Sequence, residues 1–333
     1  MNFNRILITG GDGLLGSNLI RLLLLQNYNL RVLLFPGSQA TTLDGLNLER
    51  VFGNILNIEN IDNAMKDCDG VIHIAADTTV IPARSALLRD VNIRGTENMI
   101  NVALKHKVKR FIHIGSGSSF QFGDKDNPGS ETSPFAGSKF GLDYIDSKYE
   151  AQLLVQKAVN EQNFPAIIIC PTFMIGPYDL KQSTTKMFLT LYQRKLPFCN
   201  SGGRNFVFVK DVAQAIVNSL TVEKIGEIYI AGAHNLTYKD FFRIVGEVFN
   251  VKTPQISMPN FIVLTFGAIS SLFAKIIRRP PAISYKVARV TCEKQFLSAK
   301  KAVKELNMPQ TDLKVAIQET FDWMKSNIKE FKN

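Results

Sequence analysis

The sequence is poor in the side chains that form disulfide bonds or bind metals. Its 333 residues include four cysteines and four histidines. They are Cys68, Cys170, Cys199, Cys292, His73, His106, His113 and His234. The cysteines are scattered, no CxxC spacing occurs and no histidine pair forms HExxH, so the sequence argues against a disulfide framework and predicts no catalytic metal. The same scarcity favours a reducing, cytoplasmic compartment.

We also expect no cleavable signal peptide, because the opening residues MNFNR lead directly into the first predicted strand. Charge is absent from one long stretch, residues 255–274, which a lysine and two arginines closely follow. About 20 apolar residues can span a bilayer, but a proline, an asparagine and three serines lower the apolarity here. We favour a helix that lines an apolar substrate pocket. The alternatives are peripheral membrane contact and a membrane span.

Negative charge is in deficit, since 39 Lys and Arg against 29 Asp and Glu give a formal net charge of +10. The surplus is spread along the chain rather than gathered in one basic block, which argues against nucleic-acid binding. A diffuse positive charge suits a small anionic ligand, such as a phosphorylated cofactor or a nucleotide-linked substrate.

Short apolar runs alternate with helical segments over the first 170 residues. We predict strands at residues 5–9, 31–34, 50–52, 71–74, 110–114 and 166–170, and helices at 14–25, 58–65, 87–105 and 141–160. Continuous apolar strands indicate a parallel sheet with helices on both faces, the α/β class. We assign residues 1–170 to a dinucleotide-binding domain that is completed by about 206–232. Residues 171–205, predicted to be rich in loops, and 233–333, predicted to be mainly helical, form a smaller substrate-binding domain.

A glycine-rich turn follows the first predicted strand. The run TGGDGLLG places Gly10, Gly13 and Gly16 in a GxxGxxG spacing where the first helix begins. Glycines at such a position permit a tight turn and let the backbone N–H groups of the helix N-terminus approach a pyrophosphate. We therefore predict that the three glycines, with Leu14 and Leu15, bind a dinucleotide.

Together with IHIAAD (72–77), VNIRGTENMI (91–100) and residues 298–323, this glycine loop resembles the extended branch of the short-chain dehydrogenases/reductases. The resemblance is to the group that contains dihydroflavonol reductases and nucleotide-sugar epimerases, and it covers nearly the whole chain. It implies a Rossmann-type, doubly wound parallel sheet. It also implies hydride transfer between a nicotinamide cofactor and a carbonyl or carbinol carbon.

The second predicted strand ends without the acidic residue that would bind the adenosine ribose hydroxyls of NAD. Phe35 takes that position, and Ser38 could donate a hydrogen bond to a 2′-phosphate. We therefore favour NADP over NAD. The resemblance adds further cofactor-site residues, namely Asn54, Ile55, Ala75, Ala76, Asn92 and Pro171.

Tyr144 and Lys148 stand four residues apart in the helix predicted after the fifth strand. Residues at this spacing share a helix face, and a nearby ammonium lowers a tyrosine pKa from about 10 by favouring the phenolate. The resemblance implies a YxxxK pair in which Tyr144 transfers a proton and Lys148 also binds the nicotinamide ribose. Counting from the strand makes Ser116 the hydroxyl that orients the substrate oxygen, whereas counting back from Gly123 selects Ser118. We favour Ser116 and expect the other serine to contact substrate.

The residues near the substrate leave the reaction open. Arg204, in SGGRNFVFVKDVA, resembles an arginine that contacts the diphosphate in nucleotide-sugar enzymes, whereas ICPTFMIGP (169–177) resembles the dihydroflavonol-reductase group. The other candidate substrate contacts are Thr78, Thr172 and Phe173. No carboxylate follows the fifth strand before Asp124, which argues against a dehydratase.

We predict an NAD(P)-dependent oxidoreductase that acts on an apolar ketone or secondary alcohol. The alternatives are a nucleotide-sugar 4-epimerase with retained NAD and a non-catalytic protein that senses a cofactor. The resemblance further implies a homodimer, formed through the helix that carries Tyr144 and Lys148 and the helix before it.

Overall fold

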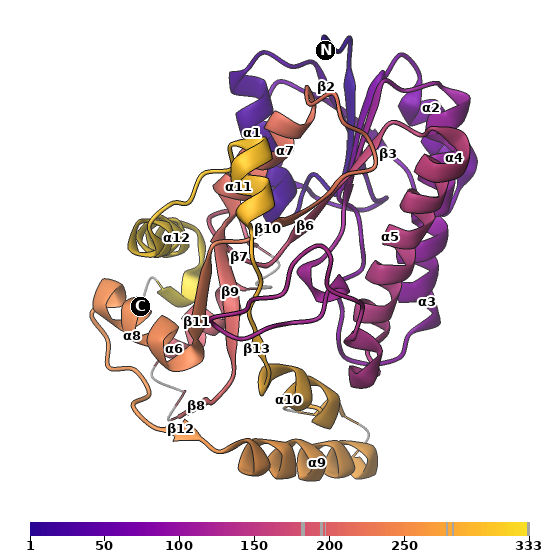
Figure 1. Cartoon of the computed structure of the whole chain (residues 1–333). Helices are drawn as coiled ribbons and strands as arrows, with labels where there is room; N and C mark the ends of the chain where they lie inside the picture. Colours follow the sequence, from indigo (N-terminus) through magenta and orange to yellow (C-terminus); the bar gives the residue numbers. More distant parts are fainter. Residues whose placement is uncertain (181–183, 194–195, 197, 278, 282, 332–333) are drawn as a thin grey trace.

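The computed structural model describes residues 1–180, 184–193, 196, 198–277, 279–281 and 283–331. Its centre is a seven-stranded sheet in the order β10-β6-β5-β4-β1-β2-β3, with every neighbouring pair parallel (Figure 1). The strands are β1 (Ile6–Thr9), β2 (Leu30–Leu34), β3 (Glu49–Phe52), β4 (Gly70–His73), β5 (Arg110–Ile114), β6 (Ala166–Pro171) and β10 (Ile228–Ala231). This order is that of a Rossmann-type fold, in which ligands bind at the carboxyl ends of the strands.

Helices cover both faces of this sheet (Figure 1). One layer contains α1 (Leu14–Leu25) and α7 (Val209–Ser219); the other contains α2 (Ile58–Met65), α4 (Gly95–Lys105) and α5 (Asp143–Gln162). Along β1, Ile6 and Ile8 pack into the first core and Leu7 into the second. Burial on both faces explains the continuous apolar strands.

The helix predicted at residues 87–105 is interrupted. The chain forms α3 (Ala86–Arg89), then a π-helical turn at Asp90–Arg94, and then α4. Periodicity cannot reveal such a turn, because one inserted residue leaves the apolar pattern on either side intact. The turn carries Asn92, which is one of the predicted site residues.

A second, smaller sheet lies beyond the carboxyl ends of the large one. In it β9 (Gly203–Phe208) pairs with β7 (Phe173–Ile175), β11 (His234–Thr237) and β13 (Lys294–Gln295). β9 lies outside the large sheet, whereas β10, within the segment 206–232 that was expected to complete the dinucleotide-binding domain, joins it. The region predicted to be rich in loops also contains β7 and α6 (Thr185–Tyr192). Further elements are β8 (Cys199–Asn200), β12 (Ser257–Met258), α8 (Tyr238–Phe249), α9 (Asn260–Ile277), α10 (Tyr285–Thr291), α11 (Lys300–Leu306) and α12 (Leu313–Asn327).

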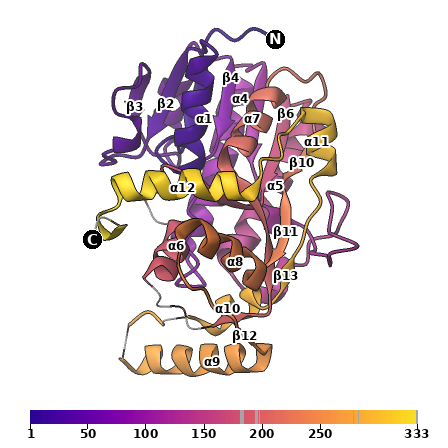
Figure 2. The same ribbon diagram turned by 90° about the vertical axis from the view of Figure 1, so that its left-hand side faces the viewer.

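Helix α9 contains most of the uncharged stretch, and it lies at the outer edge of the molecule in both views (Figures 1 and 2). The prediction that it lines a substrate pocket was wrong, because most of its large apolar side chains are exposed. Among the described residues, no helix is long and apolar enough to cross a membrane.

Candidate active site

The glycine loop packs closely against the end of β4. Gly10 has φ +71°, and a Cβ atom there would lie 2.7 Å from the backbone nitrogen of Ala75. A Cβ atom on Gly16 would lie 2.3 Å from the carbonyl oxygen of Gly10. At Gly13, by contrast, the nearest atom to an added Cβ would be 3.6 Å away. Two glycines are thus required by packing, whereas the third keeps space open where α1 begins at Leu14.

The open space at Gly13 lies at the N-terminus of α1. Gly13 is the residue that caps α1, and no side chain there accepts a hydrogen bond from the first turn. Backbone N–H groups in the first turn of a helix have no partner within the helix, and they favour an anion. Leu14 is half-buried and Leu15 is buried in the core, so these two residues could contribute only backbone groups.

The other predicted cofactor residues lie at the same edge of the sheet, after their strands. Ala75 and Ala76 are half-buried beyond β4, and Pro171 ends β6. The Oδ1 atom of Asn54 accepts a hydrogen bond from the backbone N–H of Leu56, at 2.9 Å. Ile55 is buried and its carbonyl oxygen accepts from Asn98, at 3.0 Å.

Ser38 is already engaged by a carboxylate. Its hydroxyl donates to Oδ2 of Asp12, at 3.0 Å, while Phe35 is 65% exposed after β2. The negative charge of Asp12 therefore lies beside the serine that was expected to bind a 2′-phosphate. Sequence reasoning missed Asp12 because its distance from Ser38 along the chain hides their contact.

Asn92 joins the segment after β4 to helix α5. Its Nδ2 atom donates to the carbonyl oxygen of Asp77, at 2.9 Å, and to Oγ of Ser147, at 3.0 Å. Its Oδ1 atom accepts from the backbone N–H of Asp77, at 2.7 Å. Asn92 is buried and immobilised by three hydrogen bonds, so it is suited to positioning neighbouring residues.

Tyr144 lies in the first turn of α5 and contacts the loop after β5. Burial raises the pKa of Tyr144, while a hydrogen bond with Ser116 and the positive charge of Arg204 act to lower it. Ser116 and Ser118 also share a hydrogen bond, with 2.8 Å between their Oγ atoms. Of these two serines, Ser116 is the one that acts on the pKa of Tyr144.

Lys148 lies one turn further along α5 and is buried. Its Nζ atom donates to the carbonyl oxygen of Ile114 at the end of β5, at 2.5 Å. Burial lowers the pKa of Lys148 to about 8. We expected its ammonium to lower the pKa of Tyr144, but in this structure Ser116 and Arg204 do so.

Two buried histidines lie under this site, in register on neighbouring strands. His73 and His113 have ring centroids 5.7 Å apart. Burial lowers the pKa of His73 to about 3, and burial also lowers the pKa of His113 well below its usual value. His73 pairs with Thr9 and Thr96, whereas neither ring nitrogen of His113 has a partner among the described residues.

The two buried histidines predict that the protein loses stability in acid. Unfolding exposes both rings, which then bind protons below about pH 6.5, so the stability present above that pH is lost as the pH falls. Two protons correspond to a loss of about 2.7 kcal/mol in the free energy of unfolding per pH unit. Denaturant unfolding between about pH 6 and pH 5 should show this slope. His113→Leu should halve the slope, and equal slopes in the two proteins would contradict the prediction.

Arg204 lies on the substrate side, between two aromatic rings. Its guanidinium carbon lies 4.7 Å from the centroid of Phe173, and its Nε atom donates to the hydroxyl of Tyr238, at 2.6 Å. Phe173 in turn meets Phe206 edge to face. Arg204 and Phe173 are thus brought together on the same side as Tyr144.

Two other predicted substrate residues are placed differently. Thr78 is exposed beyond β4. The Thr172 hydroxyl donates to Oδ1 of Asn205, at 2.8 Å. Asn205 also binds Asn235 and the carbonyl oxygen of Leu297, so it joins three segments of the smaller domain. Sequence reasoning missed Asn205 because a polar residue within an apolar strand carries no motif.

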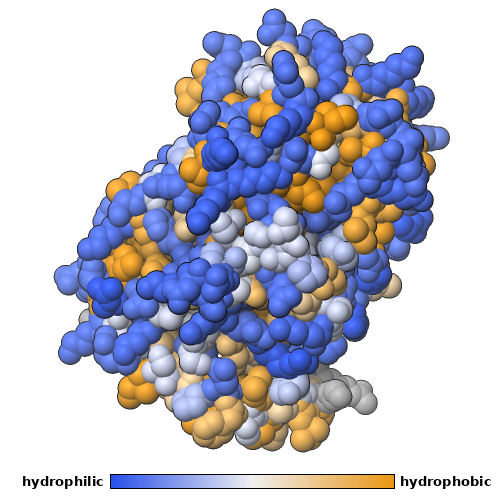
Figure 3. Space-filling model, viewed as in Figure 1, coloured by the Kyte–Doolittle hydropathy of each residue, from blue (hydrophilic) through white to orange (hydrophobic). Residues whose placement is uncertain are grey.

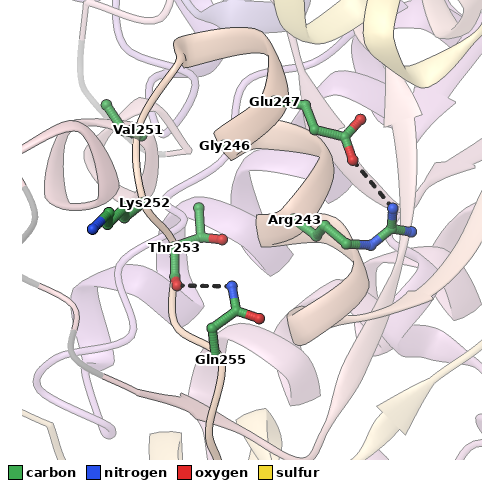
Figure 4. A pocket seen from close by; sticks show the side chains of 7 residues that line it. All are labelled: Arg243, Gly246, Glu247, Val251, Lys252, Thr253 and Gln255. Carbon is green, nitrogen blue, oxygen red and sulfur yellow. Dashed lines mark hydrogen bonds and ion pairs between the residues drawn. The ribbon is translucent and has the colours of Figure 1, made fainter.

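Two cavities lie outside the catalytic set. One, of about 410 Å³, is at the carboxyl end of α8, where Arg243 and Glu247 form a 3.1 Å ion pair (Figure 4). The other, of about 250 Å³, lies between the loop after Ser119 and the turn before α5. It is lined by Phe120, Gln121, Phe122, Ala136, Gly137, Lys139, Phe140 and Glu293. The second cavity borders the segments that carry the catalytic candidates.

Comparisons with known proteins agree with this arrangement. A protein of Synechocystis sp. named "Putative dihydroflavonol 4-reductase" is 28% identical over 326 residues, which cover 96% of this chain and 94% of that protein. The sterol-4-alpha-carboxylate 3-dehydrogenase ERG26 (decarboxylating) of Candida albicans is 25% identical over 354 residues, covering 97% and 98%. The crystal structure of gox2253 superposes with a TM-score of 0.87 at 28% identity, covering 98% of this chain and 99% of that one.

The family model described as "NAD dependent epimerase/dehydratase family" matches residues 6–232, which are more than half of the chain. This match begins at β1 and ends just after β10, so it spans the large sheet, the glycine loop and helix α5 with Tyr144. The chain therefore belongs to the NAD dependent epimerase/dehydratase family of enzymes.

Proposed function

We propose that the protein is an NAD-linked oxidoreductase of an apolar ketone or secondary alcohol. One observation carries the proposal: Ser116 lies close enough to Tyr144 to act on its pKa, and Lys148 lies one helical turn away, at the sheet edge where the glycine loop opens. A bound nicotinamide would supply or accept the hydride. The protein residues would bind the substrate oxygen, orient it and handle its proton.

Tyr144 is suited to act as the general acid in reduction. Because burial raises its pKa, its hydroxyl carries a proton at neutral pH and can donate it to the substrate oxygen. Ser116 would stabilise negative charge on that oxygen by a second hydrogen bond. In oxidation the same residues act in reverse, and Tyr144 accepts the proton.

An apolar substrate is supported by the side chains around the site. The ring of Phe173 lies beside Arg204 on one side of it and packs on the buried Phe206. Both aromatic and charged side chains line the neighbouring cavity. The names of two relatives refer to a dihydroflavonol and to a sterol carboxylate, and both are large molecules with a ring system. We infer a substrate of that general kind, with the reacting oxygen on a ring carbon.

A nucleotide-sugar 4-epimerase is the second candidate, and Arg204 is the observation that favours it. Its positive charge is close enough to act on the pKa of Tyr144, and a guanidinium binds a diphosphate well. Against this reading, Arg204 is held by Tyr238 and by the ring of Phe173.

Cofactor turnover separates the two candidates. The purified protein should oxidise added NADH when cyclic apolar ketones are supplied, with one alcohol formed for each NADH consumed. An epimerase would instead retain NAD through gel filtration and convert a UDP-sugar without net NADH consumption. Retained NAD together with epimerisation would overturn the proposed function in favour of the second candidate.

For the cofactor we propose NAD. The preference for NADP that the sequence suggested stays untested, and the Asp12 carboxylate beside Ser38 weighs against it. A carboxylate at this place would repel a 2′-phosphate, whereas it can accept hydrogen bonds from ribose hydroxyls.

Asp12→Asn is therefore expected to raise the ratio of kcat/KM with NADPH to that with NADH by about tenfold, because it removes this repulsion. Steady-state kinetics with both cofactors measure the ratio. Asp44→Asn, at a surface pair with Arg50, is the matched control and should leave the ratio unchanged. A wild-type protein that prefers NADPH, with an unchanged ratio in Asp12→Asn, would contradict the proposal.

A further inference from the structure

Helix α9 presents an apolar face to solvent along the outer edge of the smaller domain (Figures 2 and 3). Seven of its large apolar side chains are each more than half exposed. They are Phe261, Phe266, Ile269, Leu272, Phe273, Ile276 and Ile277. Soluble proteins rarely expose so many large apolar side chains together unless the patch binds something.

Small residues fix the orientation of α9 about its own axis, because they are the ones that face α10. A Cβ atom added to Gly267 would lie 2.9 Å from Cβ of Ala288 in α10, so the two helices are in close contact there. Ser271 accepts a hydrogen bond from the backbone N–H of Tyr285, at 2.9 Å, and Ala274 is buried. A helix on a soluble domain normally turns its apolar face inward. In α9 the large apolar residues face outward and the small ones inward.

The charges in the segment that contains α9 are all of one sign. Residues 251–292 contain six basic residues and no Asp or Glu. The basic residues are Lys252, Lys275, Arg278, Arg279, Lys286 and Arg289. Lys252 precedes the helix and Arg279 follows it, and both are exposed. An apolar helix face flanked by cations is complementary to an anionic lipid surface.

The same charges argue against a second copy of the chain as the occupant. In a two-fold dimer built on α9, each copy would bring the same cluster of cations to the interface, without acidic partners from residues 251–292. The dimer expected from the sequence uses α4 and α5 instead, and would leave α9 free.

We propose that α9 docks the protein on an anionic membrane, lying in the plane of the surface with its seven exposed apolar residues among the lipid chains. A helix of 18 residues is about 27 Å long. Its large apolar side chains lie on one side, and the opposite side stays packed on α10. The proposal does not depend on the reaction that the enzyme catalyses.

Docking through α9 would also place the catalytic region near the lipid. Helix α10 lies between α9 and the turn before Tyr144, and Lys286 donates to the carbonyl oxygen of Gly141, at 2.8 Å. Val290 of α10 shares an apolar cluster with Phe140 and with Tyr144. An apolar substrate dissolved in the bilayer would therefore have a short path to the site.

Co-sedimentation with vesicles tests the proposal. Vesicles of phosphatidylcholine mixed with phosphatidylglycerol should sediment the wild-type protein at least about tenfold more efficiently than phosphatidylcholine alone, and about 0.5 M salt should weaken that binding. Phe266→Gln/Phe273→Gln should lose the binding. The matched control, Leu25→Gln/Val315→Gln, changes two exposed apolar residues on α1 and α12 and should bind as the wild type does.

Light scattering and thermal unfolding of the same proteins complete the test. Because Phe266 and Phe273 are more than half exposed, the variant should keep the melting temperature and NADH oxidation of the wild type. Absence of wild-type binding to anionic vesicles would overturn the proposal, whatever the activity. Dissociation of a wild-type oligomer in the Phe266/Phe273 variant, again without vesicle binding, would show instead that a second copy covers α9.

Discussion

Replacing Tyr144 with phenylalanine is expected to lower kcat for ketone reduction by about 10²–10⁴-fold, which is the usual contribution of a positioned general acid. The change removes one oxygen atom, which contacts Ser116 and carries the proton to be donated. The ring remains, so its packing with Phe140 and Val290 should be preserved. The affinity for NADH should change less than about twofold, because that affinity depends mainly on the glycine loop.

Steady-state kinetics with a reducible ketone, together with NADH titration followed by fluorescence, measure both quantities. Tyr149→Phe is the matched control: Tyr149 lies on the same helix and its ring stacks on Phe135, with centroids 4.0 Å apart, so its hydroxyl can be removed without touching the site. If Tyr144→Phe kept wild-type kcat, the proton donor would be another group and the proposed mechanism would fail. If both variants lost activity equally, the loss would reflect helix α5 rather than the Tyr144 hydroxyl.

Much of the fold could be predicted from the sequence because its large sheet follows simple patterns. The predicted bounds of α1, α2 and β5 are those observed, since each has strong periodicity or a continuous apolar run between clear breaks. The smaller sheet was missed because its strands are short: β13, for example, has two residues and depends on pairing with β9. No local pattern reveals a pairing between segments so distant in the chain.

In the candidate site, too, the features with a local sequence pattern could be predicted and the contacts between distant segments could not. The YxxxK spacing and the glycine loop are local, and the structure brings Tyr144, Ser116 and Lys148 to one edge of the sheet. The contact between Asp12 and Ser38 joins two loops. Asp12 lies within the glycine run and Ser38 was a predicted cofactor residue, but no local pattern shows that their side chains meet. For α9, apolarity was visible in the sequence, but the direction of its apolar face depends on the close contact of Gly267 with α10.

The second prediction with a large effect concerns the glycine loop. Alanine at Gly16 and alanine at Gly13 should both weaken NADH binding, but for different reasons. In Gly16→Ala, the new Cβ atom would lie 2.3 Å from the Gly10 oxygen and 2.6 Å from Cα of Gly11. Both contacts are with backbone, so the loop itself must move. We expect a loss of about 1–3 kcal/mol in the free energy of unfolding and at least about tenfold weaker NADH binding.

Gly13→Ala should separate these two effects. Its φ of −86° suits any residue, and the nearest atom to the new Cβ would be 3.6 Å away, so stability should fall by less than about 1 kcal/mol, roughly the cost of alanine at a helix cap. NADH binding should nevertheless weaken at least about tenfold, because the methyl group would enter the space assigned to the pyrophosphate. Denaturant unfolding and NADH titration of both variants give the comparison. Wild-type affinity in Gly13→Ala would mean that the dinucleotide does not lie against the start of α1, even if Gly16→Ala behaves as expected.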